Sequence, residues 1–230
     1  MTRQKGIIIA ARVISLLFTP FYLPLLGVGV LFTFSYMSTL PTLYKWRVLL
    51  IVYLFTILLP TLMILAYRKV MGWTRIEIGQ KRRRIVPYCF SMLSYFACIE
   101  VMDSLNIFYF IRCIIFSALL IQISCVLINM VWKISTHMAA IGGVAGGLLA
   151  FTHLFIYNPI WWFCIVLFLS GMLGSARMIL RQHTLPQVVA GFGVGFVCAS
   201  YGILRDDFFT IVEAITKILL NALFNTNFEI

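Results

Sequence analysis

Two histidines and one arginine stand in short polar breaks of a chain that is otherwise strongly apolar. Arg177 and His183 are six positions apart in the segment SARMILRQHTLPQVVAG, and His137 ends the break KISTH. Arginine matches phosphate oxygens with a planar fork, while imidazole can attack phosphorus or transfer a proton near neutral pH. These residue types predict phosphoryl transfer, with His183 as the nucleophile and His137 as the general acid.

Two further groups of residues complete the predicted site. The basic block KRRRIVP, residues 81–87, forms a third polar block that supplies further cationic side chains. Ser135 and Thr136 precede an expected helix start, where backbone N–H groups can hold an anion. Three separate segments therefore contribute to one predicted anion site.

The composition places this site in a membrane protein. Of the 230 residues, 62% are hydrophobic and 11% are charged, and several apolar runs can cross about 30 Å of hydrocarbon. The net charge of +11 collects between these runs, which favours lipid headgroups or anionic substrates as partners over nucleic acid. The six cysteines fall in apolar segments without paired spacing, so we expect neither a metal nor a disulfide.

The apolar runs predict an all-α polytopic transmembrane bundle of about six to seven spans in a single domain, residues 1–230. Two spans separate each pair of polar blocks, so all three blocks are expected at one membrane face. Residues 206–225 are expected to lie in the interface or to extend the last helix. The N-terminal helical hairpin, 7–67, comprises a kinked, retained span at 7–34 and a second span at 46–67. The core, 81–204, contains spans at 88–105, 107–132, 138–156, 160–173 and 185–204.

In the order and spacing of its polar blocks, the chain resembles the type 2 phosphatidic acid phosphatase superfamily of membrane lipid phosphatases. The family pattern is a basic block ending in proline, a Ser-Gly-His block, and a Ser-Arg block followed by a histidine; the resemblance covers residues 81–191. It implies a phosphatase that needs no metal or cofactor and works through a phosphohistidine, in a bacterial inner membrane. Carried over residue by residue, the resemblance implies His183 as the nucleophile and His137 as the acid. It also implies four phosphate ligands, Lys81, Arg84, Ser135 and Arg177.

The chain departs from the family pattern in each block: the spacing of Lys81 and Arg84 to Pro87 differs from that of the first block, and Ala176 separates Ser175 from Arg177 in the third. Thr136 and Ile134 replace the glycine and the proline of the second block, and Gln187 stands where the family has the Asp that orients the nucleophilic imidazole. A glutamine oxygen can accept the Nδ1–H bond but cannot offset charge on the ring, and loss of the equivalent charge in a Ser-His-Asp triad costs about 10⁴ in rate. Slow activity, rescue by another acid and absence of activity therefore all stay open.

The leading hypothesis is an integral membrane phosphatase that hydrolyses a lipid phosphate or a prenyl diphosphate. A site at the interface lets a headgroup enter sideways while its tails stay in the bilayer. The alternatives are a catalytically silent protein that binds anionic lipid or acts as a scaffold, and a lipid phosphotransferase in which another acceptor replaces water. The basic loop favours the cytoplasmic face by the positive-inside rule, whereas many relatives act on the outer face of the inner membrane, so both sides stay open.

Overall fold

The computed structural model describes residues 2–71, 85–155 and 158–204, and the regular structure within these ranges is entirely helical. Among the described residues, five helices are long and apolar enough to cross a membrane, which indicates an integral membrane protein. The expected total of six to seven spans stays a prediction. The five are a composite helix, Thr42–Val70, and the helices α7 (Tyr109–Val131), α8 (Thr136–Phe155), α9 (Ile160–Ile179) and α10 (Leu185–Leu204).

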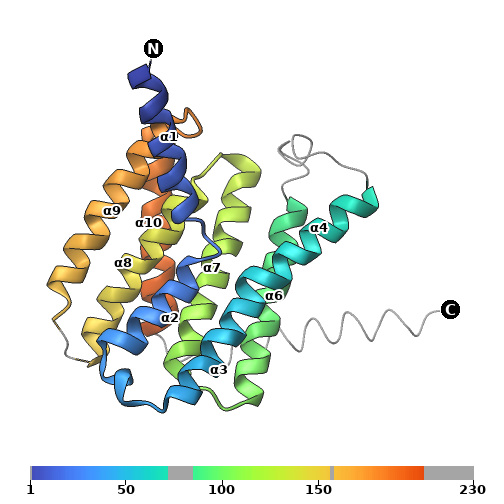
Figure 1. Ribbon diagram of the computed structural model, residues 1–230, viewed down its shortest axis with the longest axis vertical. Coiled ribbons are helices and arrows are strands. Elements are labelled where there is room, and N and C mark those ends of the chain that lie inside the picture. The colour runs from blue at the N-terminus through green and yellow to red at the C-terminus, as the bar shows by residue number, and fades with distance from the viewer. Residues whose placement is uncertain (1, 72–84, 156–157, 205–230) are drawn as a thin grey trace.

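The first apolar run does not form the single kinked span that the sequence predicted at 7–34. It forms two helices, α1 (Thr2–Leu17) and α2 (Leu23–Phe34), which meet at an angle in Figure 1. Pro20 explains the break, because proline lacks an N–H donor and disfavours helical backbone in the residue before it. The break lets α1 pack along α9 while α2 packs against α7 and α8.

The second predicted span is a continuous composite helix in which α3 (Thr42–Tyr53) passes through a π-helical turn, η2 (Leu54–Leu58), into α4 (Leu59–Met71). Pro60 cannot donate a helix hydrogen bond, so the turn before it widens, and the Leu59 N–H bonds to the carbonyl of Leu54. A side chain from α6 (Ile85–Ser104) supports the widened turn, because the Ser94 hydroxyl donates to the carbonyl of Phe55.

The close contact of α8 with α10 forms the centre of the bundle. Glycines allow it: a Cβ at Gly191 would lie 2.6 Å from the carbonyl oxygen of Ser135, and a Cβ at Gly195 would clash with the backbone of Ala139. Gly142 faces the backbone of Phe192 in the same way. The contacts advance together along both sequences, so α8 and α10 run parallel, and their N-terminal ends meet at one end of the molecule (Figure 1).

Candidate active site

The predicted site residues on α8, α9 and α10 lie at one end of the bundle. The connection from α7 to α8 and the connection from α9 to α10 both lie at this end, as do α1, the end of α4 and the start of α6 (Figure 1). Helices α8 and α10 begin here, and α9 ends here. Each predicted site residue on these three helices therefore sits at a helix terminus or in the connection beside it.

The spacing between Arg177 and His183 comes from the way α9 ends. Arg177 lies in the last turn of α9, which continues beyond the predicted end of this span at residue 173. The N–H of Gln182 bonds to the Arg177 carbonyl at 3.2 Å, and the N–H of Arg181 bonds to the Met178 carbonyl at 2.9 Å. With Arg181 in the left-handed region at φ 51°, these bonds form a Schellman motif. The motif reverses the chain between Arg177 and His183.

Gln187 fixes the orientation of the His183 ring. Its Oε1 lies 3.3 Å from Nδ1 of His183 and accepts the backbone N–H of Thr184 at 3.2 Å. The second bond is the glutamine half of a capping box, because Thr184 precedes α10 and Gln187 is the third residue of that helix. A backbone N–H can only donate, so the amide oxygen faces this pair of groups and His183 carries its proton on Nδ1. In a neutral ring, Nε2 is then the nitrogen without a proton.

The second histidine, His137, lies at the start of α8. Hydrogen bonds join the segment before α8 to the segment at the start of α10. The Ser135 N–H bonds to the Gln187 carbonyl at 3.4 Å, and Nζ of Lys133 donates to the Gln182 carbonyl at 2.7 Å. Thr136 and His137 are the first two residues of α8. The side chain of His137 interacts electrostatically with both Arg177 and His183. The structure thus gathers Arg177 and both histidines into one cluster.

Arg177 also contacts two helices that the sequence did not connect to the site. Its Nη1 donates to the hydroxyl of Ser15 on α1 at 2.7 Å, and Ser15 is 8% exposed. The backbone of Ser15 also approaches the ring of His137. Tyr88, in the first turn of α6, interacts electrostatically with the guanidinium of Arg177. Helices α1 and α6 therefore line the site together with α8, α9 and α10.

Three buried polar atoms of the cluster have no hydrogen-bond partner among the described residues. They are Oγ of Ser135, Nδ1 of His137 and Nε of Arg177. Ser135 is fully buried and precedes α8, yet its hydroxyl does not cap that helix as serine usually does there. A buried polar atom without a partner costs about 1–3 kcal/mol, so such a group needs an explanation. A ligand with several oxygens would satisfy all three atoms together.

The donor set suits an anion better than a metal ion. The cluster offers a guanidinium, a hydroxyl and two imidazoles, and within the described part of the chain no group of three His, Cys, Asp or Glu side chains could hold a metal. Guanidinium and imidazole donors match phosphate oxygens. The arrangement is chemically suited to bind an oxyanion such as a phosphate group.

Not every predicted residue can be placed. Ser135, Thr136, His137, Arg177, His183 and Gln187 lie at the site end of the bundle, whereas Lys81 and Arg84 fall outside the described residues. Sequence reasoning missed Ser15 and Tyr88. Ser15 carried no signal, because a lone serine in an apolar run is common. Tyr88 directly follows Pro87, the last residue of the basic block, so its position beside this block was a signal in the sequence.

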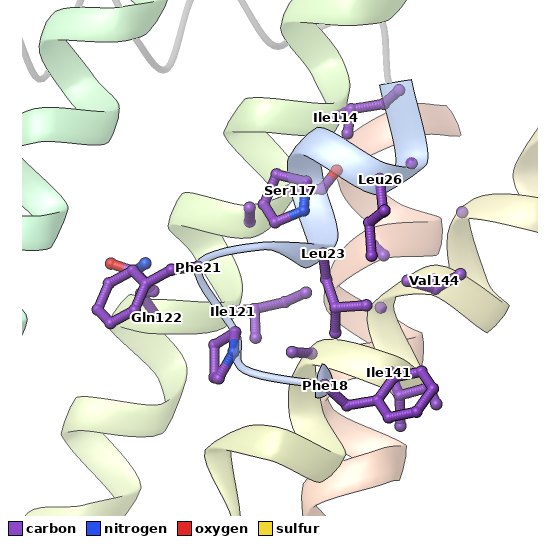
Figure 2. A pocket seen from close by; sticks show the side chains of 18 of the residues that line it. Phe18, Phe21, Leu23, Leu26, Ile114, Ser117, Ile121, Gln122, Ile141 and Val144 are labelled. Carbon is purple, nitrogen blue, oxygen red and sulfur yellow. The ribbon is translucent and has the colours of Figure 1, made fainter. Parts of the chain in front are cut away.

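A cavity of about 580 Å³ opens beside His137 and continues into the bundle. Its lining is mainly apolar. Figure 2 shows how the segment between α1 and α2, with Phe18 and Phe21, crosses it between side chains of α7 such as Ile121 and side chains of α8 such as Ile141. Thr136 and His137 belong to the cavity wall as well as to the polar cluster. The site and the cavity are therefore continuous.

Comparisons of this chain with protein-family models, with curated proteins and with solved structures find no match. The function must therefore be argued from the site itself.

Proposed function

We propose that this protein is an integral membrane phosphatase that removes a phosphate group from a lipid phosphate or a prenyl diphosphate through a phosphohistidine intermediate. The observation that carries the proposal is the cluster of Arg177, His137 and His183, in which three buried polar atoms, including Oγ of Ser135, have no partner among the described residues. A phosphate group supplies the negative charge and the oxygen atoms that these donors need.

In the proposed reaction, Nε2 of His183 attacks phosphorus, and the bond between phosphorus and the lipid oxygen breaks. Arg177 and the Ser135 hydroxyl hold the phosphate oxygens, and His137 gives a proton to the departing lipid oxygen. A water molecule then attacks the phosphohistidine, and His137 takes a proton from this water. The products are the lipid alcohol, or the monophosphate in the case of a diphosphate, and inorganic phosphate.

Gln187 supports the orientation that this mechanism needs, although it carries no charge. Its oxygen accepts the Nδ1–H of His183 and so keeps Nε2 available for attack. The resemblance to the type 2 phosphatidic acid phosphatases supports the same roles for His137, Arg177 and His183. Since the site adjoins an apolar cavity, a lipid with its phosphate at the interface is the substrate class that fits.

The test is phosphate release by the purified protein from a panel of lipid phosphates and prenyl diphosphates, with a chelator present. His183→Ala should lower the rate by about 10³-fold or more, as loss of a nucleophile does. His153→Ala is the matched control, because this histidine lies near the opposite end of α8, and it should keep full activity. Undiminished release by folded His183→Ala protein would refute the proposed role.

A second candidate is a silent protein that binds anionic lipid, and the neutral side chain of Gln187 favours it. The same cluster would then hold a phosphate headgroup without cleaving it. Binding of lipid phosphate by the wild-type protein, with no turnover even after Gln187→Glu, would select this alternative. Mass spectrometry of the products distinguishes transfer of the phosphate group to another acceptor from hydrolysis.

A further inference from the structure

Two polar side chains, Tyr95 and Gln122, line the mainly apolar cavity well below the cluster of Arg177, His137 and His183. Tyr95 of α6 is 1% exposed, and both Tyr95 and Gln122 of α7 line the cavity. The two side chains are polar neighbours. Even so, neither the Tyr95 hydroxyl nor Oε1 of Gln122 makes a hydrogen bond of normal geometry with any residue in the described ranges. Figure 2 shows Gln122 among the lining side chains of α7.

The depth of this pair can be estimated from the helices that carry it. Gln122 lies nine residues before the end of α7 at Val131, which at 1.5 Å per residue is about 13 Å below the site end of the bundle. Tyr95 lies ten residues after the start of α6 at Ile85, at a similar depth. A phosphate held beside His137 would therefore place the middle of its hydrocarbon chain near the pair.

The two unpartnered atoms of the pair favour a hydroxyl group on the ligand. The Tyr95 hydroxyl can donate, and Oε1 of Gln122 can only accept. A hydroxyl group on the ligand can accept a hydrogen bond from the Tyr95 hydroxyl and at the same time donate one to Oε1 of Gln122. An ester carbonyl cannot donate and would leave Oε1 of Gln122 without a partner, and an unbroken hydrocarbon chain would leave both atoms without one.

We propose that the cavity binds the chain of the lipid and that Tyr95 and Gln122 form a subsite inside it for a hydroxyl group in the middle of this chain. The placement of the chain rests on the proposed function, because the phosphate of the same lipid is held at His137 and Arg177. The subsite makes the protein selective for a hydroxylated chain over a plain alkyl or prenyl chain.

The experiment measures binding of octadecyl phosphate and of a series of hydroxyoctadecyl phosphates in which one hydroxyl group moves along the chain. The protein is the full chain carrying His183→Ala, which prevents turnover, and binding is measured by competition with a fluorescent alkyl phosphate. We expect the hydroxylated chain to bind about five- to tenfold more tightly than the plain chain when the hydroxyl group is near mid-chain. Equal affinities along the whole series would overturn the proposal.

Variants of the pair give the second readout. Combining Tyr95→Phe with Gln122→Leu should reverse the preference, so that the plain chain binds about fivefold more tightly, because the hydroxyl group then enters the apolar cavity without a partner. The matched control is Tyr201→Phe, a tyrosine on α10 that does not line the cavity, and it should keep the wild-type preference. A preference for the mid-chain hydroxyl group that survives in the double variant would contradict the assignment.

The outcomes keep this proposal separate from the proposed function. If the preference is found but the wild-type protein releases no phosphate from either lipid, the chain subsite stands and the phosphatase assignment fails. If phosphate is released and both chains bind equally, the phosphatase assignment stands and the subsite fails.

Discussion

Replacing Gln187 by Glu tests whether the neutral amide limits the proposed reaction. The carboxylate would take the place of an oxygen that lies 3.3 Å from Nδ1 of His183, and Glu can accept the N–H of Thr184 as Gln187 does. Negative charge is also favourable in the first turn of α10, so the fold should be retained.

The magnitude follows from the distance. Opposite unit charges about 4 Å apart attract by about 1 kcal/mol in water and about 4 kcal/mol at an effective dielectric constant of 20. Both His183 and Gln187 are partly exposed, so about 1–3 kcal/mol is the appropriate range. Because the ring gains positive charge as it attacks phosphorus, Gln187→Glu should speed formation of the phosphohistidine about 5- to 150-fold.

The assay is the single-turnover rate of phosphohistidine formation at saturating lipid phosphate, trapped with labelled substrate. Saturation is needed because the new charge also repels the phosphate group and raises KM. Gln187→Leu is the comparison: it removes the acceptor for both His183 and Thr184, and it should slow the reaction. A folded Glu variant that forms the intermediate no faster than the wild-type protein would show that the electrostatic reasoning is wrong.

Two further predictions concern Arg177 and the helix contact behind the site. Arg177→Lys should lower kcat/KM by about 10²-fold, because an ammonium group cannot bond to Ser15 and also present a fork to phosphate; a loss below threefold would argue against this role. Gly195→Ala should destabilise the protein by about 1–3 kcal/mol in thermal unfolding, because the new methyl group meets the backbone of Ala139. Gly193→Ala, on the same helix with open space around it, should unfold at or above the wild-type temperature, and equal losses in both variants would contradict the packing argument.

The order and approximate extent of most helices could be predicted from the sequence, because a membrane span carries a strong and local signal. The spans expected at 107–132 and 185–204 match α7 and α10 closely. The glycines of α8 and α10 also predicted close contact, since small residues at helical spacing are what such a contact requires. Counting spans then placed the α7–α8 and α9–α10 connections at one end of the molecule, where Figure 1 shows them.

The positions of helix ends and of the N-terminal segment could not be predicted in the same way. The Schellman motif that ends α9 usually carries a glycine at its left-handed position, but this chain has Arg181 there, so the sequence offered no sign that the helix continues through Arg177. The break between α1 and α2 depends on whether neighbouring helices stabilise a kink at Pro20, which is a tertiary question. The contact of Ser15 with Arg177 follows from that break, because α1 could pack against α9 only after separating from α2.

The packing of the bundle and the geometry of the candidate site depend on the same residues. Gly191 lies directly against the carbonyl of Ser135, and the N–H of Ser135 bonds to Gln187, so the distance between α8 and α10 also sets the distance between the two segments that carry the histidines. Glycine at position 191 lets the backbones approach to hydrogen-bonding distance, and a hydrogen bond holds them there. Because α8 and α10 are parallel, this one contact brings two helix N-termini, each favourable for negative charge, to the end of the molecule where the proposed phosphate site lies. An antiparallel pair with the same glycines would place His137 and His183 at opposite ends of the molecule, so the parallel arrangement is the feature on which the proposed chemistry depends.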